Sequence, residues 1–394
     1  MLAIVTTHPI QYQVPLWQAL ARDGRVPFEV WYLTDHGTRP SLDVEFDKTF
    51  SWDIDTLSGY PHRFLATADG ASPGTPWKCR LRERMRDRLR ETGAKALWIQ
   101  GWQVLAYWQA VREAKAAGVD VWLRGESNDL APTPQWKRLA KRLILGQLFA
   151  RVDRFFYIGT ANKRLYRSFG ISEKRLVPAL YFVDNERFAR QAAEVRPRRA
   201  ELRRQWGIAE NAYCVLFCGK FIPKKRPADL IRAAQLLEGS RRSHVHLLFV
   251  GSGELGRALR ESCNVVYDAE LMGGASSRPG LPQASFTGFL NQTEISRAYV
   301  VADCLVLPSD HGETWGLVVN EALASGLPCL VSDACGCAED LAGSKCSFPM
   351  GSINALADKL ARFHSAGPTA AALRLPSIDD SIGAIAKIYS DIGT

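Results

Sequence analysis

The sequence predicts an α/β protein built from two parallel sheets, each covered by helices. Two observations carry this prediction. Short apolar runs alternate with segments of helical periodicity along the chain, and the runs are continuously apolar instead of alternating with polar residues. Such strands are typical of parallel sheets that are buried on both faces. At 394 residues the chain has room for two domains of ordinary size.

The elements are expected in two successive series. Strands of the first series are Leu2–Thr6, Phe28–Leu33, Ala96–Gln100, Asp120–Arg124 and Arg154–Tyr157. Strands of the second series are Tyr213–Cys218, Val245–Val250, Ser285–Thr287, Cys304–Leu307 and Pro328–Ser332. Helical patterns separate them, at Pro15–Asp23, Trp102–Ala117, Pro134–Ala150, Ala228–Leu237, Gly253–Ser262, Thr293–Val301 and Leu317–Ser325. This alternation is what places the chain in the α/β class.

The pattern restarts after residue 180, which predicts the domain boundary. The stretch Tyr181–Val195, followed by Arg196-Pro197-Arg198-Arg199, is polar and lacks strand character, so we interpret it as the connection. The predicted domains are residues 1–182 and 183–375, with residues 376–394 as a final segment. Two α/β units joined in this way leave a cleft between the carboxyl ends of their sheets, where such folds bind ligands.

Composition excludes several classes of protein. Hydrophobic residues make up 46% and charged residues 23% of the chain, which excludes a disordered polypeptide. No apolar run approaches the length of a membrane span, and Met1–Thr7 is expected to be a buried strand and not a signal peptide. Nine cysteines, several within apolar runs, indicate reduced thiols in a cytoplasmic protein. Cys335-Gly336-Cys337 lacks the second Cys/His pair of a zinc site.

Positive charge is concentrated in the first half of the chain. Residues 1–200 carry 32 Lys and Arg against 21 Asp and Glu, although the net charge of the whole chain is only +9. This asymmetry indicates an anionic partner, which would be a nucleic acid, an anionic lipid surface or a phosphorylated substrate. Lys78–Arg90 and the amphipathic pattern Trp136–Leu145 either lie on an anionic membrane or are ordinary segments with their cations in water.

A glycine motif opens an alternative. Gly251-Ser252-Gly253-Glu254-Leu255-Gly256 follows an expected strand, and Asp268 and Glu270 come at the spacing of a ribose-binding acid. The pattern is that of a dinucleotide-binding turn, so an NAD(P)-dependent oxidoreductase is the alternative function. Against it, the motif falls on the second strand of its unit, and glycines in such turns also serve packing. The helix start there would suit other phosphates as well.

Two loops of the second half carry the strongest signal. Gly219–Pro227 and Glu313–Ala322 each follow a buried strand, so both are expected at the same edge of the sheet. Lys220 and Lys225 would clamp a diphosphate as point charges.

The Glu313–Ala322 loop supplies the other half of this expected site. Gly316 and Leu317 would offer backbone N–H groups at a helix start. Glu321 would bind ribose hydroxyls, and Glu313 the hydroxyls of an attached sugar. The two loops together predict a site for a nucleotide-diphosphate sugar.

These residues resemble a known family. Glu313 and Glu321, in Glu-x-Trp-Gly followed by Glu-Ala-x-Ala-x-Gly-x-Pro, resemble the E-x7-E motif of the family 4 retaining glycosyltransferases. Gly219-Lys220 with Lys225 resembles the phosphate loop of that family, and Val250–Gly253 its V-G-x-G turn. Further similar segments are Phe286–Leu290, beside the donor base in that family, and Tyr181–Phe188, its interdomain element, with Phe182 where glycine is usual.

The resemblance implies a GT-B fold: two Rossmann-like domains facing each other across a cleft, with a last helix, Ile378–Tyr389, crossing back to the first. It implies an acceptor site on the first domain, a donor site on the second, transfer with retention of anomeric configuration, and catalysis without a metal or other cofactor. Its implied catalytic residues are Glu313, Lys220 and Lys225. The implied donor-binding residues are Gly219, Gly251, Phe289, Thr314, Trp315, Gly316, Leu317 and Glu321.

Candidates for the acceptor side come from loops after strands. His8 follows the first strand and either faces the cleft or caps the next helix. Glu126 and Ser127 stand where many members of the family have an imidazole near the transferred sugar. His311, beside the Glu313 loop, is expected to line the cleft. His244-x-His246 is expected to be a surface pair and not a metal site, since no third ligand is in view.

We therefore expect a glycosyltransferase that uses a UDP-sugar and needs no metal. Its acceptor would be a glycan or a polyprenyl-diphosphate-linked glycan of bacterial polysaccharide or lipopolysaccharide synthesis, an expectation from the family resemblance alone. The expected location is the cytoplasm, at the inner face of the cytoplasmic membrane if the basic segments bind lipid. No nucleic-acid partner is expected on this interpretation; a non-enzymatic anion or nucleic-acid binder is the third alternative.

Overall fold

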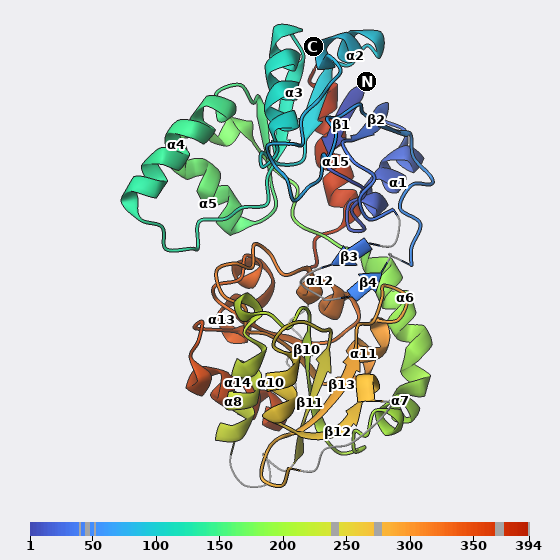
Figure 1. Ribbon diagram of the computed structural model, residues 1–394, viewed down its shortest axis with the longest axis vertical. Coiled ribbons are helices and arrows are strands. Elements are labelled where there is room, and N and C mark those ends of the chain that lie inside the picture. Colours follow the sequence, from blue (N-terminus) through green and yellow to red (C-terminus); the bar gives the residue numbers. More distant parts are fainter. Residues whose placement is uncertain are drawn as a thin grey trace. The chain divides into compact units, whose positions relative to one another are not determined.

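The chain forms two compact units, which Figure 1 shows as a ribbon. The computed structural model describes residues 1–38, 41–43, 48–50, 53–237, 244–271, 278–366 and 374–392. Unit 1 comprises Met1–Ser41, Ile54–Phe182 and Pro376–Thr394, and unit 2 comprises Leu42–Asp53 and Val183–Leu375. The segment Leu42–Asp53, which we had included in the first domain, is thus grouped with unit 2. The short strands β3 (Ser41–Asp43) and β4 (Lys48–Phe50) form a separate two-stranded sheet.

Unit 1 is built on a parallel sheet with the order β5-β2-β1-β6-β7-β8-β9. Its strands are β1 (Leu2–Thr6), β2 (Phe28–Tyr32), β5 (His62–Phe64), β6 (Ala96–Ile99), β7 (Asp120–Arg124), β8 (Arg154–Tyr157) and β9 (Leu176–Pro178). The predicted strands of the first series are confirmed. The edge strands β5 and β9 were not predicted, because each has only three residues and no continuous apolar run.

Helices cover both faces of this sheet. They are α1 (Val14–Asp23), α2 (Met85–Glu91), α3 (Leu105–Ala116), α4 (Gln135–Phe149), α5 (Thr160–Ser168) and α15 (Ile378–Ser390). Helix α15 begins at a capping box in which Ser377 and Asp380 bond each other's backbone N–H groups. It packs against α1 and buries Ile382 and Ile385 in the core that contains Trp17. The end of the chain therefore completes the core of unit 1.

Unit 2 has a second parallel sheet, with the order β12-β13-β11-β10-β14-β15-β16. Its strands are β10 (Tyr213–Cys218), β11 (Val245–Val250), β12 (Asn264–Asp268), β13 (Gln283–Gly288), β14 (Cys304–Leu307), β15 (Cys329–Ser332) and β16 (Ser347–Phe348). The strand order reverses between β10 and β14. Open α/β sheets bind ligands in the loops at the carboxyl ends of such a pair of strands.

The described helices of unit 2 include four that the sequence analysis missed. The helices are α6 (Asn185–Val195), α7 (Arg199–Gln205), α8 (Pro227–Leu236), α10 (Gly256–Glu261), α11 (Ser296–Val301), α12 (Leu317–Ala324), α13 (Gly343–Cys346) and α14 (Ile353–Ala366). Those that were missed are α6, α7, α13 and α14. Helix α6 lies in the stretch that we interpret as the connection; the two units do divide there, between Phe182 and Val183, but the residues that follow form a helix of unit 2. The Asp184 side chain caps it by accepting from the N–H of Arg187, and Phe188 and Ala192 form a buried face four residues apart.

The expectation of a surface pair at His244 and His246 was wrong for His246. Strand β11 lies between β10 and β13, so His246 has no exposed surface. The Ser285 hydroxyl donates to the carbonyl of Trp206 at 2.6 Å, which leaves its oxygen to accept from Nε2 of His246 at 2.8 Å. Burial, assisted by the charge of Arg203, lowers the pKa of His246 to about 4.

This buried imidazole predicts a loss of stability in mild acid. In the unfolded chain, His246 binds a proton below its ordinary pKa of 6.5. In the folded chain it stays neutral until the pH approaches 4. Between about pH 7 and about pH 5, His246 should cost unit 2 on the order of 2 kcal/mol of unfolding free energy. Urea unfolding at several pH values measures this change. His246→Gln should flatten the pH dependence and His244→Gln should not; parallel curves for both variants would refute the assignment.

Candidate functional site

The structure brings Lys225 and Glu313 into contact. The loop after β10 carries the lysine, the loop after β14 carries the glutamate, and β10 and β14 are neighbouring strands of unit 2. The ammonium of Lys225 forms an ion pair with Oε2 of Glu313, and the two side chains are only 20% and 12% exposed. Two opposite charges attract each other more strongly where little water surrounds them than at the exposed surface of a protein.

Further bonds fix the two loops to one another. The N–H of Asp310 donates to the carbonyl of Lys224 at 2.8 Å, which ties one backbone to the other. The hydroxyl of Ser309 donates to Oε2 of Glu313 at 3.2 Å. This carboxylate oxygen therefore accepts from Lys225 of the first loop and from Ser309 of its own loop. Ser309 was not predicted. It comes two residues after the end of β14, and a hydroxyl just past a buried strand is the signal that would have identified it.

Helix α12 begins beside Glu313. Gly316 precedes the helix with φ +106°, and a Cβ atom there would lie 2.6 Å from Cδ2 of Leu307. Only glycine fits both constraints. Among the described residues no side chain caps α12, and the first N–H groups of a helix have no partner within it. The start of α12 therefore offers backbone donors and a partial positive charge next to the ion pair.

A third loop, after β15, supports this backbone. A Cβ atom at Gly336 would lie 1.9 Å from the carbonyl oxygen of Thr314. The N–H of Gly336 donates to the carbonyl of Glu313 at 3.2 Å, and the N–H of Cys337 to that of Trp315 at 3.1 Å. The sequence analysis considered Cys335-Gly336-Cys337 only as part of a zinc site. Its place after a strand adjacent to β14 is the signal that was missed.

Glu321 and Trp315 are more enclosed than the sequence suggested. Glu321 is 4% exposed, and its Oε2 accepts a hydrogen bond from the hydroxyl of Tyr299 on α11. Trp315 is 3% exposed, and its Nε1–H donates to Oδ1 of Asn320 at 2.8 Å. The Trp315 side chain therefore fixes the first turn of α12 from inside. Tyr299 and Asn320 were not predicted, because only the fold shows which buried side chains they touch.

The glycine loops after β10 and β11 touch one another. Gly251 has φ +132°, and a Cβ atom there would lie 2.0 Å from the carbonyl oxygen of Gly219. The N–H of Gly219 donates to the carbonyl of Val250 at 3.0 Å, and that of Gly251 to Gly288 at 2.9 Å. Gly288 ends β13, just before the half-buried Phe289. Three loops are thus joined at one edge of the sheet, with the half-buried Lys220 following Gly219.

This arrangement disfavours the dinucleotide alternative. Asp268 lies on β12, which is separated from β11 by β13, so it is not on the strand next to the glycine turn. Its carboxylate is fully buried and accepts two bonds from the guanidinium of Arg260, at 2.5 and 3.2 Å. Arg260 also binds Glu270 at 2.8 Å. Both acids proposed for ribose binding in that alternative are therefore engaged with an arginine.

Two histidines have special environments. In unit 2, Nδ1 of the half-buried His311 is buried and has no hydrogen-bond partner among the described residues. In unit 1, Nδ1 of His8 lies 2.9 Å from the hydroxyl of Thr7. Burial, followed by the charge of His36, lowers the pKa of His8 to about 4, so this imidazole is neutral at physiological pH.

Glu126 and Ser127 are held by defined contacts in unit 1. The hydroxyl of Tyr181 donates to Oε1 of Glu126 at 2.7 Å, and Arg124 lies 3.4 Å from the same oxygen. The guanidinium of Arg124 stacks on the Tyr181 ring at 4.5 Å. The carbonyl of Ser127 accepts from the amide of Asn162 at 2.6 Å. The carboxylate at the end of β7 is therefore oriented, although 42% of its side chain is exposed.

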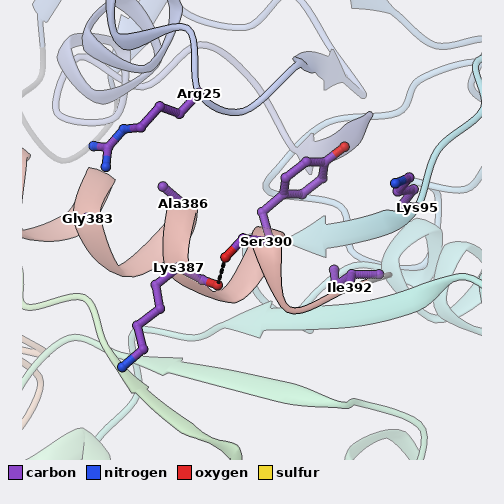
Figure 2. Close-up of a pocket in the computed structure, with 8 residues that line it drawn as sticks. Arg25, Lys95, Gly383, Ala386, Lys387, Ser390 and Ile392 are labelled. Carbon is purple, nitrogen blue, oxygen red and sulfur yellow. Dashed lines mark hydrogen bonds between the residues drawn. The ribbon is translucent and has the colours of Figure 1, made fainter. Parts of the chain in front are cut away.

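Unit 1 also contains two open pockets. Figure 2 shows one of about 540 Å³ beside α15, where Arg25, Lys95 and Lys387 line the wall and the Ser390 hydroxyl donates to the Lys387 carbonyl at 2.7 Å. The other, of about 580 Å³, is lined by Leu33, Thr34, Asp35, Thr38, Leu57 and Phe64. Neither pocket is lined by a residue that the sequence analysis predicted to take part in catalysis or binding. Among the described residues, no group of three or more His, Cys, Asp or Glu side chains is placed to hold a metal ion.

Comparison with known proteins adds to this geometry. Residues 198–374 match the model of a family described as glycosyl transferases group 1, and this range lies within unit 2. One curated relative is the D-inositol 3-phosphate glycosyltransferase of Actinosynnema mirum, which is 36% identical over 133 residues. That match covers 33% of this chain and 30% of that protein. The chain spans about a third of the length of the curated relatives that it matches first.

Solved structures match along the whole chain. A glycosyltransferase from Rickettsia africae has a TM-score of 0.68 at 13% identity, covering 99% of this chain and 98% of that one. Anabaena HepE, solved in complex with UDP and glucose, has a TM-score of 0.58 at 14% identity, covering 98% and 94%. These likenesses show the fold. It is the GT-B fold, in agreement with the two seven-stranded parallel sheets.

Proposed function

We propose that the protein is a retaining glycosyltransferase that transfers a sugar from a nucleotide-diphosphate sugar, with UDP as the nucleotide, and that it works without a metal. The observation that carries this proposal is the half-buried contact of Lys225 with Glu313 beside the start of α12. A cation, a carboxylate and open backbone donors at one sheet edge suit a diphosphate attached to a sugar. The glycosyltransferase names among the relatives support it, and HepE supports the choice of UDP.

The donor is proposed to lie across the loops of unit 2. Lys225, Lys220 and the first N–H groups of α12, at Gly316 and Leu317, bind the diphosphate. Glu313 accepts from hydroxyls of the transferred sugar. Glu321, in its nearly closed position, accepts from the ribose. The remaining donor-binding residues of this proposal are Gly219, Gly251, Phe289, Thr314 and Trp315, of which Trp315 acts by holding the loop.

The chemistry follows from where charge develops. As the bond from the anomeric carbon to the diphosphate oxygen breaks, negative charge builds on the diphosphate, and Lys225 and Lys220 stabilise it in place of a metal ion. The acceptor hydroxyl attacks the same face of the sugar, so the configuration is retained, and its proton passes to the leaving phosphate oxygen. Glu313 is not assigned the role of nucleophile, because an ion pair and the Ser309 hydroxyl occupy its Oε2.

The acceptor is proposed to be a glycan or lipid-linked glycan of bacterial polysaccharide or lipopolysaccharide synthesis. Unit 1 carries the excess of positive charge, which suits a polyprenyl-diphosphate-linked acceptor. His8, Glu126, Ser127 and His311 are the residues proposed to contact it. The oriented carboxylate of Glu126 is suited to accept a hydrogen bond from a sugar hydroxyl. Cytoplasmic location at the inner membrane face belongs to the same proposal.

Thermal unfolding with nucleotides tests this function. UDP or a UDP-sugar at about a hundred times its dissociation constant should stabilise the protein by about 2.7 kcal/mol, which raises the melting temperature by several degrees. NADH should leave it unchanged, because Asp268 is not available to a ribose. Stabilisation by NADH and not by UDP, GDP or their sugars would overturn the proposal in favour of the oxidoreductase.

A further inference from the structure

Helix α4 is anchored in unit 1 only by its last turns. Its buried residues are Leu145, Leu148 and Phe149, which join the core between the sheet and its helices. Every residue before them, from Gln135 to Ile144, is exposed. Figure 1 shows α4 at the outer edge of unit 1. The sequence analysis left open whether this pattern lies on an anionic membrane or is an ordinary segment with its cations in water. In the structure most of the helix is not packed against the rest of unit 1.

The exposed part is apolar on one side. Trp136, Leu139, Leu143 and Ile144 are 69%, 60%, 64% and 59% exposed. Spacings of three and four residues place the first three on one helix face, with Ile144 beside them. Large apolar side chains are rarely left in water at such density on a soluble surface. The segment therefore has a surface that suits a partner.

Its charges indicate which partner. The same segment carries Lys137, Arg138, Lys141 and Arg142, and α4 contains no Asp or Glu. Lys137 and Arg142 flank the apolar stripe, and long basic side chains can turn their charged ends back toward headgroups. An amphipathic helix with bulky apolar residues on one side and cations around them matches an anionic lipid surface.

We propose that residues 135–144, the docking helix, bind the surface of an anionic lipid bilayer. The apolar stripe enters the boundary between headgroups and acyl chains, and the cations pair with lipid phosphates. This inference rests on the proposed function in one respect, since it explains how the enzyme would reach a lipid-linked acceptor. Among the described residues no helix is long and apolar enough to cross a bilayer, and the docking helix would lie along its surface.

Other occupants and other segments fit less well. Two copies of the docking helix face to face would bring their cations together with no acid of either helix between them.

The other basic segment, Lys78–Arg90, is built differently. Its apolar residues Met85 and Leu89 are buried, and Arg82 and Arg88 form ion pairs with acids of unit 1. That segment is therefore not part of the proposed surface.

Co-sedimentation with vesicles tests the proposal. The probe is a vesicle of equal parts phosphatidylcholine and phosphatidylglycerol, with pure phosphatidylcholine as the neutral comparison. A variant with Trp136→Ser, Leu139→Ser, Leu143→Ser and Ile144→Ser should bind the anionic vesicles at least about tenfold more weakly than wild type. A variant with Lys137→Gln, Arg138→Gln, Lys141→Gln and Arg142→Gln should lose binding to a similar extent.

A matched control removes the same charge elsewhere. Lys78→Gln, Arg80→Gln, Arg84→Gln and Arg90→Gln together should retain most of the binding, and Trp77→Ser should retain it as well, although Trp77 is 82% exposed. The proposal is overturned if wild type fails to bind anionic vesicles or if the docking-helix variants bind as wild type does. It is also overturned if the control loses as much, or if wild type is a dimer without lipid that the serine variant converts to a monomer.

Stabilisation by UDP separates this proposal from the proposed function. All variants should keep it, because their substitutions lie in unit 1 and leave the donor loops of unit 2 intact; this also shows that they are folded. Loss of vesicle binding with stabilisation kept supports the docking helix. Vesicle binding without stabilisation by any nucleotide sugar supports the docking helix and refutes the donor site.

Discussion

Replacing Lys225 with alanine should slow sugar transfer by about a thousandfold, since it removes one of the cations that we propose to stabilise the departing diphosphate. The same change leaves the Glu313 carboxylate, 12% exposed, without its ion-pair partner. Because the pair is half-buried, we expect the loss to cost about 2 kcal/mol of unfolding free energy, less than in a fully buried pair. Transfer rates from a UDP-sugar to a glycan acceptor, measured together with the melting temperature, report the two effects separately.

A second substitution distinguishes catalysis from stability. Adding Glu313→Gln to Lys225→Ala removes the uncompensated charge, so the double variant should regain stability and remain inactive. Lys345→Ala is the matched control, because this exposed lysine of unit 2 lies in α13 and is not part of the loops after β10 and β14. A folded Lys225→Ala protein with nearly wild-type turnover would refute the assignment of the donor site.

Gly251→Ala should be among the most destabilising single substitutions in unit 2. The added Cβ would lie 2.0 Å from the carbonyl oxygen of Gly219, a backbone atom that cannot move without displacing the loop that leads to Lys220 and Lys225. The residue would also have to keep φ at +132°. Together these effects should cost at least about 3 kcal/mol, which thermal unfolding measures.

Two other glycines separate the clash from the backbone strain. Gly219 has a similar φ of +150° but open space around its Cβ position, so Gly219→Ala should cost much less. Gly146 lies within α4 with nothing near its Cβ position, and Gly146→Ala should stabilise the protein by about 1 kcal/mol. Equal destabilisation by Gly251→Ala and Gly219→Ala would show that the close approach of the two loops is not required.

The fold could be predicted best where burial is complete. The bounds of β1, β7, β8, β10, β11 and β14 agree with the predicted strands residue for residue. A strand that is covered on both faces must be apolar throughout, so its sequence marks both ends. The edge strands β5, β9, β12 and β16 lack this constraint and were missed. Helix α6 was missed because only Phe188 and Ala192 of its residues are buried.

The sequence could predict which loops of the site are neighbours, because this depends only on the order of the strands in the sheet. Because parallel strands present their carboxyl ends at one edge, the sequence could place the Lys225 loop beside the Glu313 loop, and the ion pair confirms that placement. Ser309 and Gly336 were missed although each lies in a loop that follows a buried strand of the same sheet. The sequence could not identify Tyr299, since this residue contacts Glu321 from another helix, whose position depends on the whole sheet. The enclosure of Glu321 depends on the same neighbours.

Helix α15 gives the protein an unusual order of completion. Residues 376–394 leave the ribosome after every residue of unit 2, yet they supply Ile382 and Ile385 to the core that contains Trp17. Most of unit 1 is therefore synthesised first, but its core can be completed only after unit 2 has been synthesised. Until then, the nascent chain keeps an apolar surface beside α1 open to water and to chaperones, while unit 2 can already close its own core.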